Sequence, residues 1–304
     1  MITIKNYHKG LSFILFSAMA FGVMPIFAKL AYEGGISTAA LLSLRFIISG
    51  LLLLIYLKAF KINWRVSYRD LLNLFLLGGV FYSATSIFYF SSIKYIHISL
   101  TVLLMYTHPM IVAILSAIFN KEKITLKMVL AMFVAFVGLA LILGDSFISE
   151  LSGLGIMLAI ASAVSYSLYI FVSSRVIKEV QSIVATAYIS IFASFGMLAI
   201  GLIQRDLTFI LNKTVLLPLL GLIFICTIFA ILFFLRGVEV LGPTKATIIS
   251  MFEPVFAAVF SLIIFKEKLS FLQLAGGMAV LCGALMVIAM KGHEIEEVID
   301  STNI

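Results

Sequence analysis

The sequence predicts an all-α integral membrane protein in which ten transmembrane helices form two inverted five-helix repeats. Three observations predict this fold class: the composition, an internal repeat, and the distribution of Lys and Arg over the loops. Of the 304 residues, 63% are hydrophobic and only 12% are charged, and the mean hydropathy is +1.20. A soluble domain has about 25% charged residues. One core cannot hide this much apolar surface, so the surrounding solvent must be lipid.

The predicted spans follow from the thickness of a bilayer, which requires about 20 apolar residues per helix. Short connections between the apolar runs hold most of the charged and turn-forming residues. The ten predicted spans are 11–32, 37–57, 71–93, 98–119, 127–144, 153–173, 183–203, 214–235, 243–264 and 271–290. Residues 292–304 follow as a polar, acidic tail that we expect to be disordered.

The first span has an alternative interpretation. Its short basic start, its apolar run and the Ala-Met-Ala sequence at 18–20 are also typical of a signal peptide. Against this, the residue types of Gly10, Ala18 and Ala20 occur again at the same spacing in the sixth span, as expected of a repeated transmembrane helix. We therefore interpret 11–32 as a transmembrane helix.

Lys and Arg in the loops predict the orientation, because cytoplasmic loops carry an excess of both. With ten spans, the two termini lie on the same side. Thirteen positive residues lie on the same side of the membrane as the termini: Lys5, Lys9, Lys58, Lys61, Arg65, Arg69, Lys121, Lys123, Lys127, Arg175, Lys178, Arg236 and Lys291. Five positive residues lie on the opposite side: Lys94, Arg205, Lys213, Lys266 and Lys268. Both termini are therefore predicted to be cytoplasmic, and the net charge of +7 requires no nucleic-acid partner.

The internal repeat relates residues 106–125 to residues 251–270 at an offset of 145, with seven of twenty positions identical. The sixth span echoes the first at a similar offset, so the repeated unit has five helices, and we divide the chain into repeats 1–145 and 146–291. Because five is odd, the second copy must cross the membrane in the opposite direction. Inverted repeats of this kind are the structural basis of alternating access, with a site near the midplane between the halves.

The repeat places a proline in the middle of two spans, as His108-Pro109 and as Glu253-Pro254. Proline removes the hydrogen bond to the carbonyl group four residues earlier, which frees the carbonyls of Met105 and Ser250. Lipid tolerates such breaks only where protein or a wet cavity satisfies the freed groups. Pro109 and Pro254 therefore predict two equivalent helix kinks around a central site.

Glu253 is the most informative single residue, since a charge at the bilayer centre costs at least ~2.5–3.5 kcal/mol. Two interpretations stay open: Glu253 binds substrate or a proton, or it supports the kink through backbone N–H groups or a buried cation. The same alternatives hold for His108, where a structural role at the kink is favoured over a role as ligand. A titrating histidine at this point could share a proton with the site.

At this stage the chain resembles the EamA-type members of the drug/metabolite transporter superfamily, over nearly its whole length. The matching features are Arg45-Phe46 in the second span, the two prolines, the Lys-Glu-Lys loops, and Gly138 and Gly283 in the fifth and tenth helices. The resemblance implies two five-helix bundles around a central cavity. The first, third, fourth, sixth, eighth and ninth helices would line this cavity, with the fifth and tenth packed peripherally. It also implies transport of small metabolites, in bacteria most often export of amino acids and related compounds.

On these helices the sequence offers tyrosines that are candidates for contact with an amphipathic solute. Tyr82 and Tyr89 share one helical stripe with Ser86. The remaining three are Tyr106, Tyr166 and Tyr169. For each tyrosine the alternative is ordinary helix packing, which is the commoner role at this spacing.

Three cations within spans are weighed separately: Lys29, Arg45, and Lys245, which opens the ninth span two turns before Glu253 at the expected mouth of the pathway. Lys29 is a candidate to meet a substrate carboxylate or Glu253, and its alternative is to extend to the membrane interface. Arg45 is interpreted as a structural clamp that bonds backbone carbonyls or an acidic partner. Gly78 and Gly79 are expected to permit close helix approach.

We therefore expect a secondary transporter of the bacterial plasma membrane that works without an ATPase domain in this chain. An exporter of amino acids is the favoured form, and an uptake carrier or exchanger is the alternative. Protons are a candidate coupling ion. A channel is disfavoured, because an inverted repeat with broken helices favours a carrier. An intramembrane enzyme is disfavoured, because the chain has neither a HExxH nor a GxSxG motif and predicts no metal or cofactor site.

Overall fold

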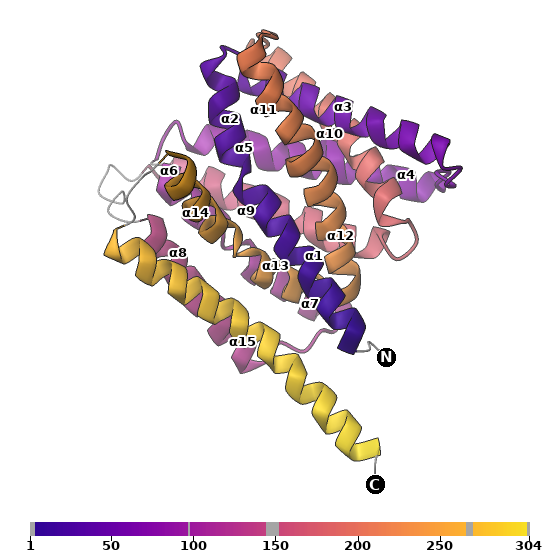
Figure 1. Cartoon of the computed structure of the whole chain (residues 1–304), viewed down its shortest axis with the longest axis vertical. Helices are drawn as coiled ribbons and strands as arrows, with labels where there is room; N and C mark the ends of the chain where they lie inside the picture. The colour runs from indigo at the N-terminus through magenta and orange to yellow at the C-terminus, as the bar shows by residue number, and fades with distance from the viewer. Residues whose placement is uncertain (1–3, 97, 144–151, 266–269, 303–304) are drawn as a thin grey trace.

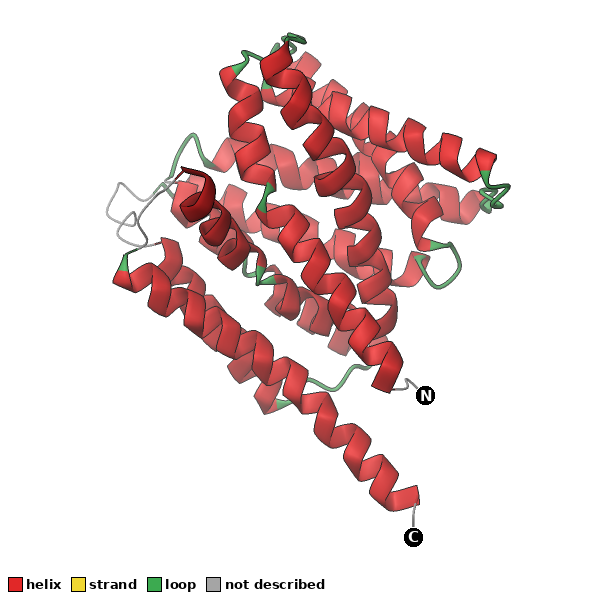
Figure 2. Cartoon of the chain, viewed as in Figure 1, coloured by secondary structure: helices red, strands yellow, loops and turns green. Residues whose placement is uncertain are grey.

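The computed structural model describes residues 4–96, 98–143, 152–265 and 270–302. These residues form helices and short connections, with no strand among them (Figure 2). The elements in chain order are α1 (Ile4–Gly22), α2 (Met24–Glu33), α3 (Thr38–Ala59), α4 (Tyr68–Phe75), the π-helix η1 (Leu76–Tyr82), α5 (Ser83–Ser92), α6 (Ile98–Met105), α7 (His108–Asn120), α8 (Leu126–Leu143), α9 (Gly153–Val176), α10 (Ser182–Gln204), α11 (Lys213–Ile223), the π-helix η2 (Phe224–Phe229), α12 (Ala230–Leu241), α13 (Pro243–Ser250), α14 (Glu253–Phe265) and α15 (Phe271–Thr302).

Eight helical segments of the described chain are long and apolar enough to cross a membrane, and two shorter apolar helices accompany them. The eight correspond to the predicted spans other than the fifth and tenth. The two shorter helices, Leu126–Ile142 and Phe271–Val287, fall within those two. The prediction of a multi-pass all-helical membrane protein is thus confirmed, while the full count of ten stays a prediction.

The two predicted kinks are complete breaks between helices. In the first repeat α6 has 8 residues and α7 has 13, and in the second α13 has 8 and α14 has 13. Pro109 and Pro254 each occupy the second position of the helix that follows the break. A proline there needs no backbone N–H donor, so each helix restarts at the residue before its proline.

A third break interrupts the first span at Val23, between α1 and α2. Pro25 lies in the first turn of α2 and is the cause, for the same reason as at Pro109. The predicted span 11–32 is confirmed as part of the apolar segment Asn6–Glu33, and the break within it is an addition that the structure makes. Pro25 is a signal that the sequence does carry.

The third and eighth spans each contain a π-helix in their middle, η1 and η2. Gly78 in η1 lies directly against α10, where a Cβ atom would collide with the carbonyl oxygen of Ile189. This confirms the close approach expected there. Single π-turns inside α-helices are often found at functional sites.

Helices α8 and α15 pack along each other at the side of the bundle (Figure 1). A Cβ atom added to Gly138 would lie 2.6 Å from the carbonyl oxygen of Gly276, and one added to Gly283 would lie 2.6 Å from that of Ala131. Because residue numbers rise along one helix as they fall along the other, the pair is antiparallel.

Helices α3 and α10 form a second antiparallel pair. Gly50 lies against Ile191, and Gly201 lies against Ala39. These two helices are the second and seventh predicted spans, so two pairs of corresponding helices, α8 with α15 and α3 with α10, are antiparallel.

Helix α15 continues through Lys291 to Thr302, which differs from the disordered tail that the sequence predicts. Three glutamates at 294, 296 and 297 favour continuation, since Glu is a good helix former. The chain ends of α1 and α15 lie at the same end of the molecule (Figure 1).

Candidate functional site

The candidate site is built around the two breaks that precede α7 and α14. The amide of Thr107 donates to the carbonyl of Leu104 at 3.2 Å, and the amide of Phe252 donates to that of Ile249 at 3.1 Å. Each break is therefore a single tight turn that redirects the chain. His108 and Glu253 are the first residues beyond these turns.

His108 satisfies a carbonyl that the proline leaves free. Its Nδ1 lies 3.1 Å from the carbonyl oxygen of Met105, the group whose usual donor Pro109 removes. Because a carbonyl only accepts, Nδ1 carries the proton in this contact. The other ring nitrogen, Nε2, is buried and has no hydrogen-bond partner. His108 thus has a structural contact on one side and an unused hydrogen-bonding atom on the other.

Aromatic rings extend from His108 across the interior. The His108 ring lies 4.9 Å from that of Tyr166 and 5.6 Å from that of Tyr106, measured between centroids. Tyr166 stacks on Tyr169 at 5.8 Å, and Tyr169 meets Tyr82 edge-on at 5.6 Å. Three helices, η1, α7 and α9, and the turn that holds Tyr106 therefore contribute to one continuous aromatic cluster.

Glu253 closes this cluster on the side of the second repeat. The side chains of Tyr106 and Glu253 lie within hydrogen-bonding reach of each other. Tyr89 and Tyr166 lie within electrostatic range of the same carboxyl group. Glu253, Tyr106, Tyr166 and Tyr82 keep partial exposure, whereas His108 and Tyr169 are buried.

The backbone of Glu253 is fixed by its contact with the first span. A Cβ atom added to Gly22 would lie 3.0 Å from the carbonyl oxygen of Glu253 and 2.8 Å from Cβ of Phe256. The break at Val23 therefore lies directly against the first turn of α14. The absence of a side chain at Gly22 is what permits the two broken spans to meet.

Serines of α9 tie this helix to its neighbours. The Ser162 hydroxyl donates to the carbonyl of Thr85 at 3.0 Å. The Ser167 hydroxyl donates to the carbonyl of His108 at 3.3 Å and to that of Ala163 at 2.7 Å. These bonds hold the stacked tyrosines of α9 in position between α5 and α7.

Arg45 extends the cluster toward the eighth span. Its guanidinium lies 4.5 Å from the ring centroid of Phe46, and that ring meets Tyr82 at 5.2 Å. Nε donates to Oγ1 of Thr227 at 2.8 Å, and Nη1 contacts Sδ of Met24 at 3.1 Å. Nη2 is buried without a hydrogen-bond partner.

These contacts correct the expectation for Arg45. The recorded partners are a hydroxyl and a thioether, where the sequence led us to expect carbonyls or a carboxylate. Met24 begins α2 and Thr227 belongs to η2. Arg45 therefore joins two irregular helix segments that no sequence pattern had connected.

Not every predicted residue belongs to the cluster. Lys29 lies on α2 with its side chain exposed. Ser86, predicted on one stripe with Tyr82 and Tyr89, lines a separate hollow of about 380 Å³ between α3, α5 and α10. Among the described residues, no group of three metal-binding side chains is found.

Eight long apolar segments define a multi-pass membrane protein. Several of them are interrupted in mid-span, and they bring a carboxyl group together with tyrosines at a buried polar site. The chain belongs to the EamA-like transporter family, whose model matches residues 8–144 and again residues 153–289. The resemblance to the drug/metabolite transporter superfamily is thereby confirmed.

Similar proteins agree with this assignment. An uncharacterized transporter of Archaeoglobus fulgidus is 26% identical over 261 residues, covering 84% of this chain and 90% of its own length. The uncharacterized transporter YyaM of Bacillus subtilis is 21% identical, covering 71% of this chain and 73% of its own. A crystal structure, described only as that of a protein, superposes with a TM-score of 0.80 at 18% identity and covers 94% of this chain and 98% of that one. This last match shows the fold.

Proposed function

We propose that this membrane transporter moves a small metabolite by alternating access between two inverted repeats, and that it exports amino acids or related compounds. The observation that carries the proposal is the meeting of Tyr106 and Glu253. Each lies beside the break of its own repeat, and the two come together in the interior. A site made from both repeats at interrupted helices is the arrangement that alternating access requires.

The inverted relation of residues 1–145 to residues 146–291 is supported by helix direction. If the second repeat crosses the membrane in the opposite sense, corresponding helices must be antiparallel. The pairs α8 with α15 and α3 with α10 are antiparallel. The equal lengths of the helices around the two breaks support the same relation.

The tyrosine cluster suits an amphipathic organic solute. The rings of Tyr82, Tyr106, Tyr166 and Tyr169 offer apolar faces, and the hydroxyl groups offer hydrogen bonds. Glu253 in its charged form would bind an ammonium group of the solute, and in its neutral form it would carry a proton. We propose Tyr89 and His108 as further contacts, and Lys29 as the partner of a substrate carboxylate.

The proposed setting is the bacterial plasma membrane, with both termini in the cytoplasm. The greater number of Lys and Arg on that side supports this orientation. The position of both chain ends at one end of the molecule is compatible with it (Figure 1).

The test is the extracellular metabolite profile of bacteria that overproduce the chain. The cells are preloaded with dipeptides to raise internal amino acids and are compared with cells that carry the empty vector. A specific rise of one or a few amino acids outside the cell is the expected result. No rise would count against amino-acid export and favour uptake or another metabolite.

Counterflow in proteoliposomes then separates a carrier from a channel. The compound found outside the cells is loaded inside the vesicles, and labelled compound is added outside. A carrier accumulates label inside the vesicles transiently above its equilibrium level, because the excess of unlabelled compound inside competes with the label for exit. Simple equilibration without this overshoot would contradict alternating access.

A further inference from the structure

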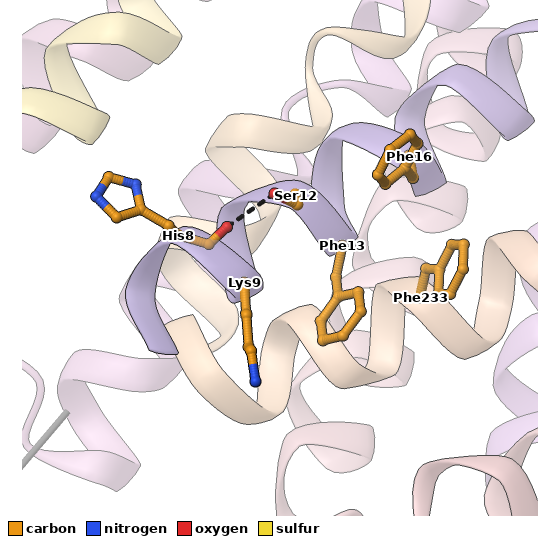
Figure 3. A pocket seen from close by; sticks show the side chains of 6 residues that line it. All are labelled: His8, Lys9, Ser12, Phe13, Phe16 and Phe233. Carbon is orange, nitrogen blue, oxygen red and sulfur yellow. Dashed lines mark hydrogen bonds between the residues drawn. The ribbon is translucent and has the colours of Figure 1, made fainter. Parts of the chain in front are cut away.

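A hollow of about 480 Å³ lies on the outside of the bundle, between α1 and α12 and away from the tyrosine cluster (Figure 3). Six residues line it: His8, Lys9, Ser12, Phe13, Phe16 and Phe233. None of them is a carboxylate. The hollow lies close to the start of the first predicted span and the end of the eighth, which are residues 11 and 235. It therefore falls at the level where lipid headgroups meet the acyl chains.

Phenylalanine rings form the inner part of this hollow. Phe13 stacks on Phe233 with ring centroids 5.7 Å apart and planes 19° apart. Phe16 and Phe229 lie 6.2 Å and 6.0 Å from the same Phe233 ring. Phe16 is 53% exposed. This surface is apolar and open to the membrane, so it suits an acyl chain.

Each helix contributes one cation near this hollow: Lys9 lines the hollow, and Arg236 lies beside the Phe13 ring that lines it. The Lys9 side chain extends beside the end of α12 (Figure 3). The guanidinium carbon of Arg236 lies 5.9 Å from the centroid of the Phe13 ring. Both side chains are exposed. Glu239, one turn beyond Arg236, accepts a hydrogen bond from the Ser182 hydroxyl at 3.1 Å and is thereby held toward α10.

Two glycines permit the close packing of α1 and α12 beside this hollow. A Cβ atom added to Gly10 would lie 2.8 Å from Cγ1 of Val240, and one added to Gly237 would collide with Ile14. The two helices can pack this closely only because both positions lack a side chain. Their close packing brings one cation from each helix to the neighbourhood of the Phe13 ring, an arrangement of positive charge that attracts an anion.

We propose that this hollow binds an anionic glycerophospholipid. Its phosphate group lies between Lys9 and Arg236, and one acyl chain lies on the rings of Phe13, Phe16 and Phe233. Basic pockets between transmembrane helices on the cytoplasmic side bind anionic headgroups in this way. The proposal is independent of the transported solute, since no residue of the tyrosine cluster takes part.

The experiment measures lipid binding to the purified full chain by native mass spectrometry. The protein in detergent is titrated with dioleoyl phosphatidylglycerol and, separately, with dioleoyl phosphatidylcholine, which has the same acyl chains and no net charge. The anionic lipid is expected to bind more tightly. Each cation near an anionic lipid contributes roughly fivefold to the affinity. The affinity of the double variant K9Q/R236Q for phosphatidylglycerol is therefore expected to fall about 25-fold. Its affinity for phosphatidylcholine is expected to stay unchanged.

The matched control is K58Q/R69Q, which removes one exposed Lys and one exposed Arg from the same predicted side but away from the hollow. It is expected to keep the preference for phosphatidylglycerol. An unchanged preference in K9Q/R236Q, or an equal loss in the control, would overturn the proposal. If the double variant does not fold, the single variants K9Q and R236Q are each expected to lose about fivefold.

A further arm uses glycerophosphoglycerol, the headgroup without acyl chains. Binding of this soluble anion as tight as that of the lipid would also contradict the proposal, because the phenylalanine surface would then contribute nothing. Phe16→Leu is expected to weaken the binding of both lipids equally, since it changes the contact with the acyl chain and leaves the Phe13 ring beside Arg236 in place.

Discussion

Adjacent glycines on α15 offer a direct test of how α8 and α15 pack. A Cβ atom added to Gly276 would lie 2.7 Å from the amide nitrogen of Ile142 and 2.9 Å from Cβ of Leu141, and it would collide with the carbonyl of Gly138. A Cβ atom added to Gly277 would meet nothing within 4 Å. The substitutions Gly276→Ala and Gly277→Ala therefore make the same chemical change in two different environments.

The expected difference in the free energy of unfolding between the two variants follows from two opposing effects. Alanine in place of glycine stabilises a helix interior by about 1 kcal/mol, and this gain is common to both variants. Gly276→Ala additionally forces the helices apart or shifts their backbones, and overpacking of this kind costs about 1–3 kcal/mol. The difference between the variants removes the common gain. Gly276→Ala should thus be less stable than Gly277→Ala by about 1–3 kcal/mol.

The assay is reversible unfolding by sodium dodecyl sulfate in mixed micelles, followed by circular dichroism for the parent and both variants. The free energies of unfolding are compared at the same detergent fraction. Equal stability of Gly276→Ala and Gly277→Ala would refute the close contact between α8 and α15. The antiparallel pairing that supports the inverted repeats would then lose one of its two observations.

The remaining predictions concern the interior. Glu253→Gln keeps the shape of the side chain and removes its charge and its proton. Because loss of a charged contact with the solute is worth about 1.5–3 kcal/mol, the KM measured by counterflow should rise about 10- to 150-fold. Tyr106→Phe should cause a smaller rise in KM. A folded Glu253→Gln protein with unchanged rate, KM and pH dependence would exclude both the proton role and the substrate role. Thr227→Val leaves the buried Nε–H group of Arg45 without its 2.8 Å acceptor and should cost about 1–3 kcal/mol of stability. Thr247→Val is the control, because the Thr247 hydroxyl bonds only carbonyls of its own helix, those of Pro243 and Thr244. Equal losses in the two valine variants would show that Thr227 is no anchor for Arg45.

Sequence reasoning located the kinks because their cause is local. A proline removes one hydrogen bond wherever it stands in a helix, so Pro109 and Pro254 identify two breaks without any knowledge of their neighbours. Pro25 acts by the same mechanism, and the break at Val23 was equally accessible. The two π-helices had no comparable local signal. The structure shows tight packing at one of these π-helices, where Gly78 lies against Ile189, and such a contact can be seen only once the helices are assembled.

Helical spacing alone did not decide which neighbours the side chains of Tyr82 and Ser86 meet. Tyr82 ends η1 and packs on Phe46 and Tyr169. Ser86, one regular turn later in α5, donates a hydrogen bond to the carbonyl of Tyr82 and lines the hollow between α3 and α10. Both residues lie on one helical stripe, and the helices that pack around this stripe determine what each side chain contacts.

The sequence by itself determined the class of protein, the places of most helices and the repeat, and it singled out Glu253 as a candidate. Each of these depends on composition, on chain direction or on a single residue. The tertiary structure decided which side chains meet: Tyr106 with Glu253, Arg45 with Thr227, and Lys9 with the end of α12. These pairs come from helices far apart in the chain. Their contact depends on how each helix is rotated about its axis against its neighbour, and the sequence of one helix does not specify that rotation.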